Sequence, residues 1–169
     1  MIKRAIIFFL IVFGGALLVA AAHSTTQDIV PFNGFAPGTI VVKTSERRLY
    51  FVIDPDHALR FPVGVGRPGM AWTGVERIDG KYVLPAWTPP PSIWGNRPGP
   101  RPVYPGGSPR NPMGAAALTL RGGEYAIHGT NNPASIGKFV SHGCIRMYNE
   151  DIRALYSMVS VGTPVVVER

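Results

Sequence analysis

Two short runs of sequence decide the fold and the chemistry of this chain: Ile127-His128-Gly129-Thr130 and Ser141-His142-Gly143-Cys144-Ile145-Arg146-Met147. They contain the only cysteine of the 169-residue chain and two of its four histidines. A cysteine nucleophile needs a base that takes its proton and backbone amides that receive a developing oxyanion. Together the two runs offer all three components, so they predict a nucleophilic cysteine site.

Within these runs, Cys144 is the predicted nucleophile and His128 its predicted base. His142 is only two residues from Cys144, and its ring would struggle to reach the sulfur in a tight turn, so it receives a supporting role. The sequence between the two runs contains no acidic residue, which leaves the backbone carbonyl of Gly129 to orient the base. Gly143 permits a tight turn, and we expect the amides of His142, Gly143 and Cys144 to form the oxyanion hole.

Other interpretations of the cysteine stay open from the residues alone. Cys144 is either a structural side chain packed under a helix or, with His128 and His142, a zinc ligand. The zinc interpretation lacks an evident fourth ligand and any Cys-x-x-Cys spacing. If Cys144 and His128 instead form an ion pair, the thiol should react well below the free-thiol pKa of about 8.5.

Residues 1–22 have the three-part layout of a secretory signal: basic Lys3 and Arg4, an uncharged apolar run, and small residues at the end. A retained anchor helix is the alternative, because the apolar stretch approaches the ~18–20 residues that span a bilayer. Either interpretation predicts export to the periplasm or cell envelope. Residues 23–37 are the predicted linker, and residues 38–169 the predicted catalytic domain.

The charge of the chain favours anionic partners outside the membrane. The formal net charge is +7, and without Lys3 and Arg4 it becomes about +5, since 15 basic residues face 10 acidic ones. This excess suits an anionic wall polymer or acidic peptides. The basic residues are scattered rather than clustered, so the sequence does not predict nucleic-acid binding.

Short segments rich in β-branched and aromatic residues recur about every ten residues and predict a mainly β sandwich or barrel. The predicted strands are Thr39–Lys43, Arg48–Ile53, Leu59–Val65, Lys81–Leu84, Ala116–Leu120, Tyr125–Ile127 and Pro164–Val167. One helix is predicted between Asn149 as its N-cap and Gly162 at its end, because apolar residues at positions 152, 155, 156 and 159 share one face.

The segment Pro85–Pro112 differs from the rest, because ten of its 28 residues are proline and it contains Trp87 and Trp94. Proline cannot donate to a central strand ladder, so the segment is not core sheet. A disordered linker is one interpretation. Tryptophans and a position between predicted strands favour the other, an ordered lid over the active site.

The two runs, extended through Asn131-Asn132-Pro133 and Ser135-Ile136-Gly137, closely resemble the catalytic motif of L,D-transpeptidases of the YkuD type. The resemblance covers Gly38 to Glu168 in layout and is strongest between Tyr125 and Asp151. It implies a YkuD-like, mainly β catalytic domain with one or two short helices. The segment between Val65 and Pro112 fits the family less well.

The resemblance implies that Cys144 attacks a peptidoglycan tetrapeptide stem, releases D-alanine, and passes the acyl group to an amine of a neighbouring stem as a 3→3 cross-link. His128 would move the protons, Ser141 would shape the turn, and Thr130 would support the site. Arg146 would support the site or meet a substrate carboxylate. The resemblance implies no metal or organic cofactor. It does imply that carbapenems acylate the cysteine.

Several alternatives remain at this point. The acceptor could be a wall-attached protein, or water could resolve the acyl-enzyme and make the domain an L,D-carboxypeptidase or endopeptidase. The alternative that is not an enzyme is a β-domain that binds the cell wall without catalysis. The implied partners are peptidoglycan stem peptides, with membrane contact only through the N-terminal segment.

Overall fold

The structure is a computed structural model that describes residues 27–169. Its strands are β1 (Asp28–Pro31), β2 (Ile40–Lys43), β3 (Arg48–Val52), β4 (His57–Pro62), β5 (Val65–Gly66), β6 (Gly74–Val83), β7 (Ala116–Leu120), β8 (Ala126–His128), β9 (Phe139–Ser141), β10 (Ile145–Arg146) and β11 (Pro164–Glu168). Its helices are α1 (Pro91–Trp94), the 3-10 helix η1 (Pro133–Ser135) and α2 (Asn149–Met158). The mainly β fold predicted from the sequence is confirmed.

Nine of these strands form one sheet in the order β1-β4-β3-β2-β11-β6-β7-β8-β10, and β5 pairs with β9 in a second, small sheet. The long strand β6 joins the two halves of the large sheet. Its first residues pair with β11 and its last residues pair with β7, with an irregularity between Ile78 and Gly80. A bulge of this kind bends a strand, so the sheet turns at β6 and brings β8 and β10 round to its far end.

The two faces of the sheet are covered differently. On one face, Ile40 and Val42 join a core with Ile152 and Leu155 of α2. On the other face, Val41 lies in a second cluster with Tyr50, Val52 and Ala58. Alternate residues of a strand point to opposite faces, which explains this division.

Residues 28–35 cover the second cluster and were not predicted to do so. Part of the predicted linker is strand β1, which pairs with β4 from Asp28 opposite Arg60 to Pro31 opposite His57. Phe32 stacks on Tyr50 with ring centroids 4.3 Å apart. An edge strand of four residues has little local signal, so the sequence pattern missed it.

Most predicted elements match the structure to within one residue at each end, and three differ by more. The segment Leu59–Val65 is interrupted after Pro62, where β4 ends before β5 begins. Strand β6 begins at Gly74 rather than Lys81, because pairing with β11 supports its charged first half. Helix α2 ends at Met158, and Gly162 instead has a φ of 93° in the turn before β11.

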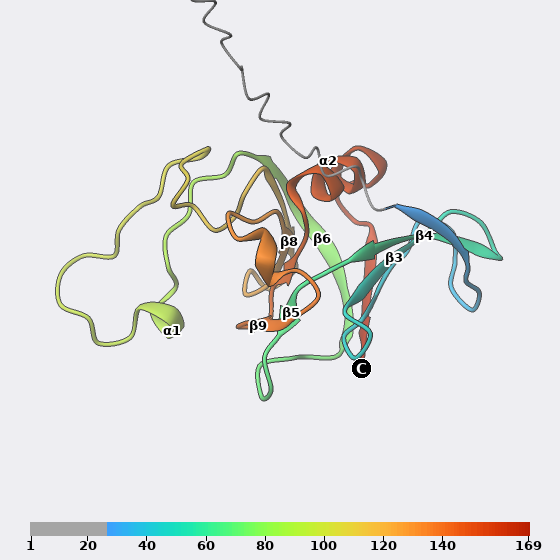
Figure 1. Cartoon of the computed structure of the whole chain (residues 1–169), viewed down its shortest axis with the longest axis horizontal. Coiled ribbons are helices and arrows are strands. Elements are labelled where there is room, and N and C mark those ends of the chain that lie inside the picture. The colour runs from blue at the N-terminus through green and yellow to red at the C-terminus, as the bar shows by residue number, and fades with distance from the viewer. Residues whose placement is uncertain (1–26) are drawn as a thin grey trace, which may run out of the picture.

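The predicted N-terminal signal or anchor lies outside the described residues. Among residues 27–169, no helix is long and apolar enough to cross a membrane. The segment 85–112 leaves the sheet as a long excursion that carries α1, on the side of the molecule opposite β1 and β4 (Figure 1). The two predicted site runs lie on and beside β8 and β10, which come between this excursion and α2 in chain order.

Candidate active site

The parallel pairing of β8 and β10 brings the two site runs together. Ile127 lies opposite Ile145, and His128 lies opposite Arg146. Both isoleucines are buried in the core. Since side chains alternate along a strand, His128 and Arg146 share the other face of this edge, and Cys144 precedes β10 on that same face.

His128 ends β8 and is only 4% exposed. Its Nδ1 lies 2.6 Å from the Gly129 carbonyl oxygen. That oxygen is an acceptor, so a neutral ring carries its proton on Nδ1 and leaves a lone pair on Nε2. The backbone carbonyl of His128 accepts from the Met147 amide at 2.8 Å, which joins β8 to the residue after β10.

Burial lowers the pKa of His128 to about 4. The Gly129 carbonyl opposes this effect, the Arg146 charge adds to it, and the Pro112 carbonyl opposes it again. The ring is therefore neutral over the physiological range, which suits a general base. The two carbonyls also face the ring where they would stabilise an imidazolium once a proton arrives.

Cys144 is a free, half-buried thiol. Burial raises its pKa, and the Ala126 amide and the Arg146 charge act in the opposite direction. With a raised thiol pKa and a lowered imidazole pKa, both groups are neutral at neutral pH. The structure therefore argues against the ion pair considered from the sequence, because desolvation penalises both charges.

Arginine charges act on the thiol and on both histidines. Arg146 acts on Cys144, His128 and His142, and Arg67 acts on His142 as well. Burial, followed by these two arginine charges, lowers the pKa of His142. Within residues 27–169, Arg146 Nε is a buried donor with no hydrogen-bond partner. The site therefore has a positive potential and a donor that is available to an anionic group.

The turn between Ser141 and Cys144 is closed by the buried Ser141 hydroxyl. It donates to the Cys144 carbonyl at 2.6 Å and accepts from the Gly143 amide at 3.1 Å. Gly143 has a φ of 121°, as expected for a residue that must be glycine. One of the three predicted oxyanion-hole donors, the Gly143 amide, already donates its hydrogen bond to the Ser141 hydroxyl. The amides of His142 and Cys144 remain the candidates.

The comparisons with known proteins agree with this geometry. The sequence model of the YkuD family, the L,D-transpeptidase catalytic domain, matches residues 37–167. The chain belongs to this family. The YkuD resemblance recognised in the two site runs is thereby confirmed.

Two relatives illustrate how this L,D-transpeptidase catalytic domain compares in sequence. It is 38% identical over 154 residues to the probable L,D-transpeptidase ErfK/SrfK of Escherichia coli, which covers 84% of this chain and 49% of that protein. It is 56% identical over 62 residues to the putative L,D-transpeptidase YkuD of Bacillus subtilis. That match covers 37% of this chain and 38% of that protein. The chain spans about half the length of the first of these relatives.

Solved structures of L,D-transpeptidases share the fold. The catalytic domain from the Enterococcus faecium enzyme superposes with a TM-score of 0.60 at 21% identity, covering 80% of this chain and 100% of that one. L,D-transpeptidase 3 from Mycobacterium tuberculosis gives a TM-score of 0.61 at 18% identity, covering 78% and 60%. At these identities the likeness concerns the fold alone.

Two aromatic residues of the YkuD domain support the Gly143 turn and were missed by sequence reasoning. Trp72 Nε1 donates to the Gly143 carbonyl at 3.1 Å. The Trp72 ring stacks on Tyr125, with centroids 5.1 Å apart and planes 10° apart. A Cβ at Gly143 would collide with the Tyr125 ring. Trp72 lies between Val65 and Pro112, the segment that fits the family less well, so the resemblance gave no signal for it.

Asn149 was also assigned wrongly from the sequence. The N-cap of α2 is Tyr148, and the Asn149 side chain does not cap the helix. Its Oδ1 accepts from the amides of Ala115 at 3.0 Å and Thr130 at 3.1 Å, and its Nδ2 donates to the Thr130 carbonyl at 3.1 Å. Asn149 thus holds the YkuD domain's base loop, Gly129–Thr130, against the start of β7.

The excursion 85–112 is fastened at its base. Trp87 and Tyr104 exchange two backbone hydrogen bonds at 2.9 and 2.8 Å. The buried Asn111 amide nitrogen donates to the carbonyls of Pro85, Tyr104 and Pro105 at 2.8 to 3.2 Å. The segment is thus an ordered part of the YkuD domain that leads through Pro112 to the ring of His128. Its closure over Cys144 stays a prediction.

The zinc interpretation finds no support in the described part of the YkuD domain. Within residues 27–169, no three or more histidine, cysteine or acidic side chains are grouped to hold a metal ion. His128 and Arg146 share one face, and a cation beside Arg146 would be repelled.

Proposed function

We propose that this domain is an exported cysteine L,D-transpeptidase that acts on peptidoglycan stem peptides. The observation that supports the proposal is the register of β8 and β10, which sets His128 opposite Arg146, two residues after Cys144. Family membership supplies the reaction class. The substrate would be a tetrapeptide stem that ends in D-alanine.

The first half-reaction follows from the protonation states. His128 Nε2 takes the Cys144 proton as the sulfur attacks the carbonyl carbon before the terminal D-alanine. The S–C bond forms, the carbonyl becomes an oxyanion, and the new imidazolium is stabilised by the Gly129 and Pro112 carbonyls. The imidazolium then protonates the D-alanine nitrogen as the C–N bond breaks, leaving a thioester.

The second half-reaction reverses these roles. An acceptor amine attacks the thioester carbon, His128 takes a proton from the amine, and the Cys144 thiol leaves with that proton. With a side-chain amine of a neighbouring stem, the product is a 3→3 cross-link. A wall-attached protein amine would give protein anchoring by the same steps.

The positive surroundings of the thiol fit a substrate rich in carboxylates. Arg146 Nε is the buried donor available for a substrate carboxylate or carbonyl, and His142 and Arg67 lie around the same turn. The amides of His142 and Cys144 are the proposed oxyanion donors. Gly143 would join them only when the Ser141 hydroxyl moves away from its amide.

Intact-mass spectrometry tests the proposal. The purified domain is incubated with a carbapenem, and separately with a disaccharide-tetrapeptide, and Cys144→Ala is the control. We expect a covalent adduct on the native protein alone, together with cross-linked dimer and released D-alanine. Released D-alanine without dimer would mean hydrolysis, and the domain would then be an L,D-carboxypeptidase.

A folded native protein that forms neither adduct nor product would contradict the proposal and favour a wall-binding domain without catalysis. Export is tested separately. Fusing residues 1–26 to a reporter that is active only outside the cytoplasm should give signal, and N-terminal sequencing of the mature protein would separate a cleaved signal from a retained anchor.

A further inference from the structure

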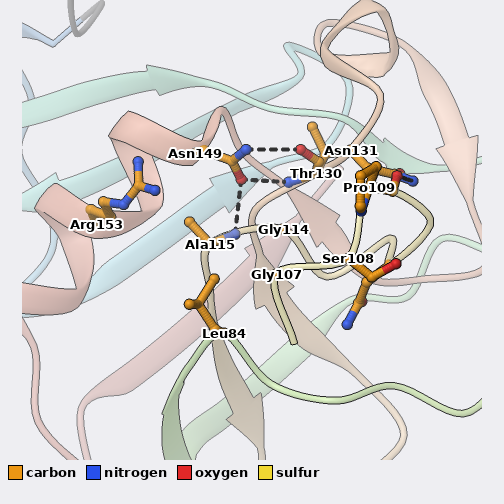
Figure 2. Close-up of a pocket in the computed structure, with 11 residues that line it drawn as sticks. Leu84, Gly107, Ser108, Pro109, Gly114, Ala115, Thr130, Asn131, Asn149 and Arg153 are labelled. Atoms are coloured by element: carbon orange, nitrogen blue, oxygen red, sulfur yellow. Dashed lines mark hydrogen bonds between the residues drawn. The ribbon is translucent and has the colours of Figure 1, made fainter. Parts of the chain in front are cut away.

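A cavity of about 350 Å³ lies beside the base loop, apart from the Cys144 turn. The C-terminal limb of the 85–112 excursion forms one wall, the loop after β8 forms another, and α2 forms the third (Figure 2). Thr130, which lines it, is two residues beyond His128. A volume of this size holds a ligand about as large as one or two amino-acid residues.

Hydrogen bonds fix the walls of this cavity. Asn149 binds both Thr130 and Ala115 in the view of Figure 2. Across the cavity, Asn131 Nδ2 donates to the Pro109 carbonyl at 2.9 Å and fastens the excursion to the base loop. The cavity is therefore preorganised, and a ligand would bind without first ordering its walls.

The lining has a definite chemical character. Arg153 lies at one end of the cavity and Ser108 at the other (Figure 2). Arg153 has only a loose, exposed contact with Glu150, at 3.9 Å, so its guanidinium can engage a ligand. Leu84 and Ala115 form an apolar floor. Among the described residues that line the cavity, none is acidic.

These groups match a peptide end with a free carboxylate. A guanidinium binds a carboxylate with two parallel hydrogen bonds. The Asn131 side-chain oxygen can accept from the preceding peptide N–H, because its amide nitrogen is the atom that donates to Pro109. The floor suits a methyl side chain and the apolar stem of the chain before it.

We propose that this cavity binds the carboxylate-terminated end of a second peptide stem, the acceptor. The identity of the ligand as a peptide stem rests on the proposed function. Its chemical character, a free carboxylate on a short peptide, rests on the cavity alone. With its last residue held beside Arg153, the acceptor stem would run along the base loop. The amine one residue earlier would then be on the His128 side of the cavity, where a base is needed in the second half-reaction.

The test is a binding titration of the Cys144→Ala chain, followed by the NMR signals of the Arg153 side-chain N–H and the Asn131 amide. The probe is a tetrapeptide stem with a free C-terminal carboxylate, compared with the same peptide as its C-terminal carboxamide. We expect both signals to move with the free acid. The carboxamide should bind about tenfold more weakly, because one charge-assisted pair is lost.

Arg153→Gln should weaken binding of the free acid by a similar factor of about ten. Arg121→Gln is the matched control, because Arg121 is exposed and follows the opposite end of β7 from Ala115. Free D-alanine serves as a third probe. If it moves the two signals as strongly as the tetrapeptide does, the cavity binds the released product and the acceptor proposal is wrong.

Equal affinities for acid and carboxamide, or shifts confined to residues 141–146, would also overturn the proposal. This outcome is separate from the proposed function, because carbapenem acylation of the native protein does not require the cavity. An Arg153→Gln protein that is acylated normally but makes fewer cross-links would support both ideas together.

Discussion

Trp72 donates its indole N–H to the carbonyl of Gly143, the residue that precedes the predicted nucleophile, across a separation of 71 residues in sequence. The bond fixes the peptide plane between Gly143 and Cys144, and this plane carries the Cys144 amide. Because that amide is a proposed oxyanion donor, we propose Trp72 as a positioning residue for the reaction. Its stacking on Tyr125 holds the indole in place.

The substitution Trp72→Phe should keep most of the stack and remove the hydrogen bond. We expect the carbapenem acylation rate to fall roughly fivefold, because one net hydrogen bond contributes about 1 kcal/mol. Trp94→Phe, in α1, is the matched control and should acylate normally. Equal acylation rates in the two variants would show that Trp72 has only a packing role.

Asn149→Ala should loosen the base loop. It removes three hydrogen bonds to Thr130 and Ala115, and we expect the free energy of unfolding to fall by about 2–3 kcal/mol. Denaturant titration measures this loss, with the loop variant Asn96→Ala as control. If Asn149 also positions His128, acylation of the folded variant will slow as well, whereas a purely structural residue would leave that rate unchanged.

The pH dependence of Cys144 alkylation distinguishes a neutral pair from an ion pair. With the thiol pKa raised and the imidazole pKa lowered, little thiolate exists in acid. The rate of reaction with iodoacetamide should therefore rise continuously above about pH 8, without an acid plateau. A plateau that extends down to pH 5 and disappears in His128→Asn would restore the ion-pair interpretation.

The stability of the fold should depend on pH through His128. Its pKa is about 4 in the folded chain and 6.5 in the unfolded chain. Between these two pH values, therefore, mainly the unfolded chain binds the proton. Protonation therefore favours unfolding, and stability decreases as the pH falls from 6.5 towards 4. Between pH 7 and pH 5 we expect a loss of about 2 kcal/mol.

Urea titrations at the two pH values measure this loss. His128→Asn keeps an amide that can donate to the Gly129 carbonyl but does not titrate, so its stability should change less over the same range. A variant with the same pH dependence as the native protein would mean that another group, such as His142, controls it.

The sequence was most informative where the determinants are local. The cysteine run, the strand–turn–strand patterns around β2, β3, β7 and β8, and the Gly129 carbonyl beside His128 all lie within short windows. Trp72 and Asn149 could not be found in this way, because their partners are distant in sequence. Asn149 was misread as a cap because capping is the commonest local use of asparagine before a helix.

The same reasoning explains the errors in the fold. Strand β1 owes its existence to pairing with β4 and to the Tyr50 ring beneath Phe32, neither of which leaves a pattern in its own residues. The first half of β6 is rich in charged residues and becomes a strand because β11 pairs with it. Tertiary pairing overrides local propensity at both places.

The central position of β11 has a consequence for how the chain reaches its folded state. Among the strands of residues 27–169 it comes last in chain order, yet in the large sheet it lies between β2 and β6 and links β1–β4 to β6, β7, β8 and β10. During synthesis or passage through a translocation channel, the place between β2 and β6 stays empty until Pro164–Glu168 emerges. Premature pairing of the exposed β2 and β6 edges with other chains is then the principal hazard, and rapid docking of Pro164–Glu168 is the step that ends it.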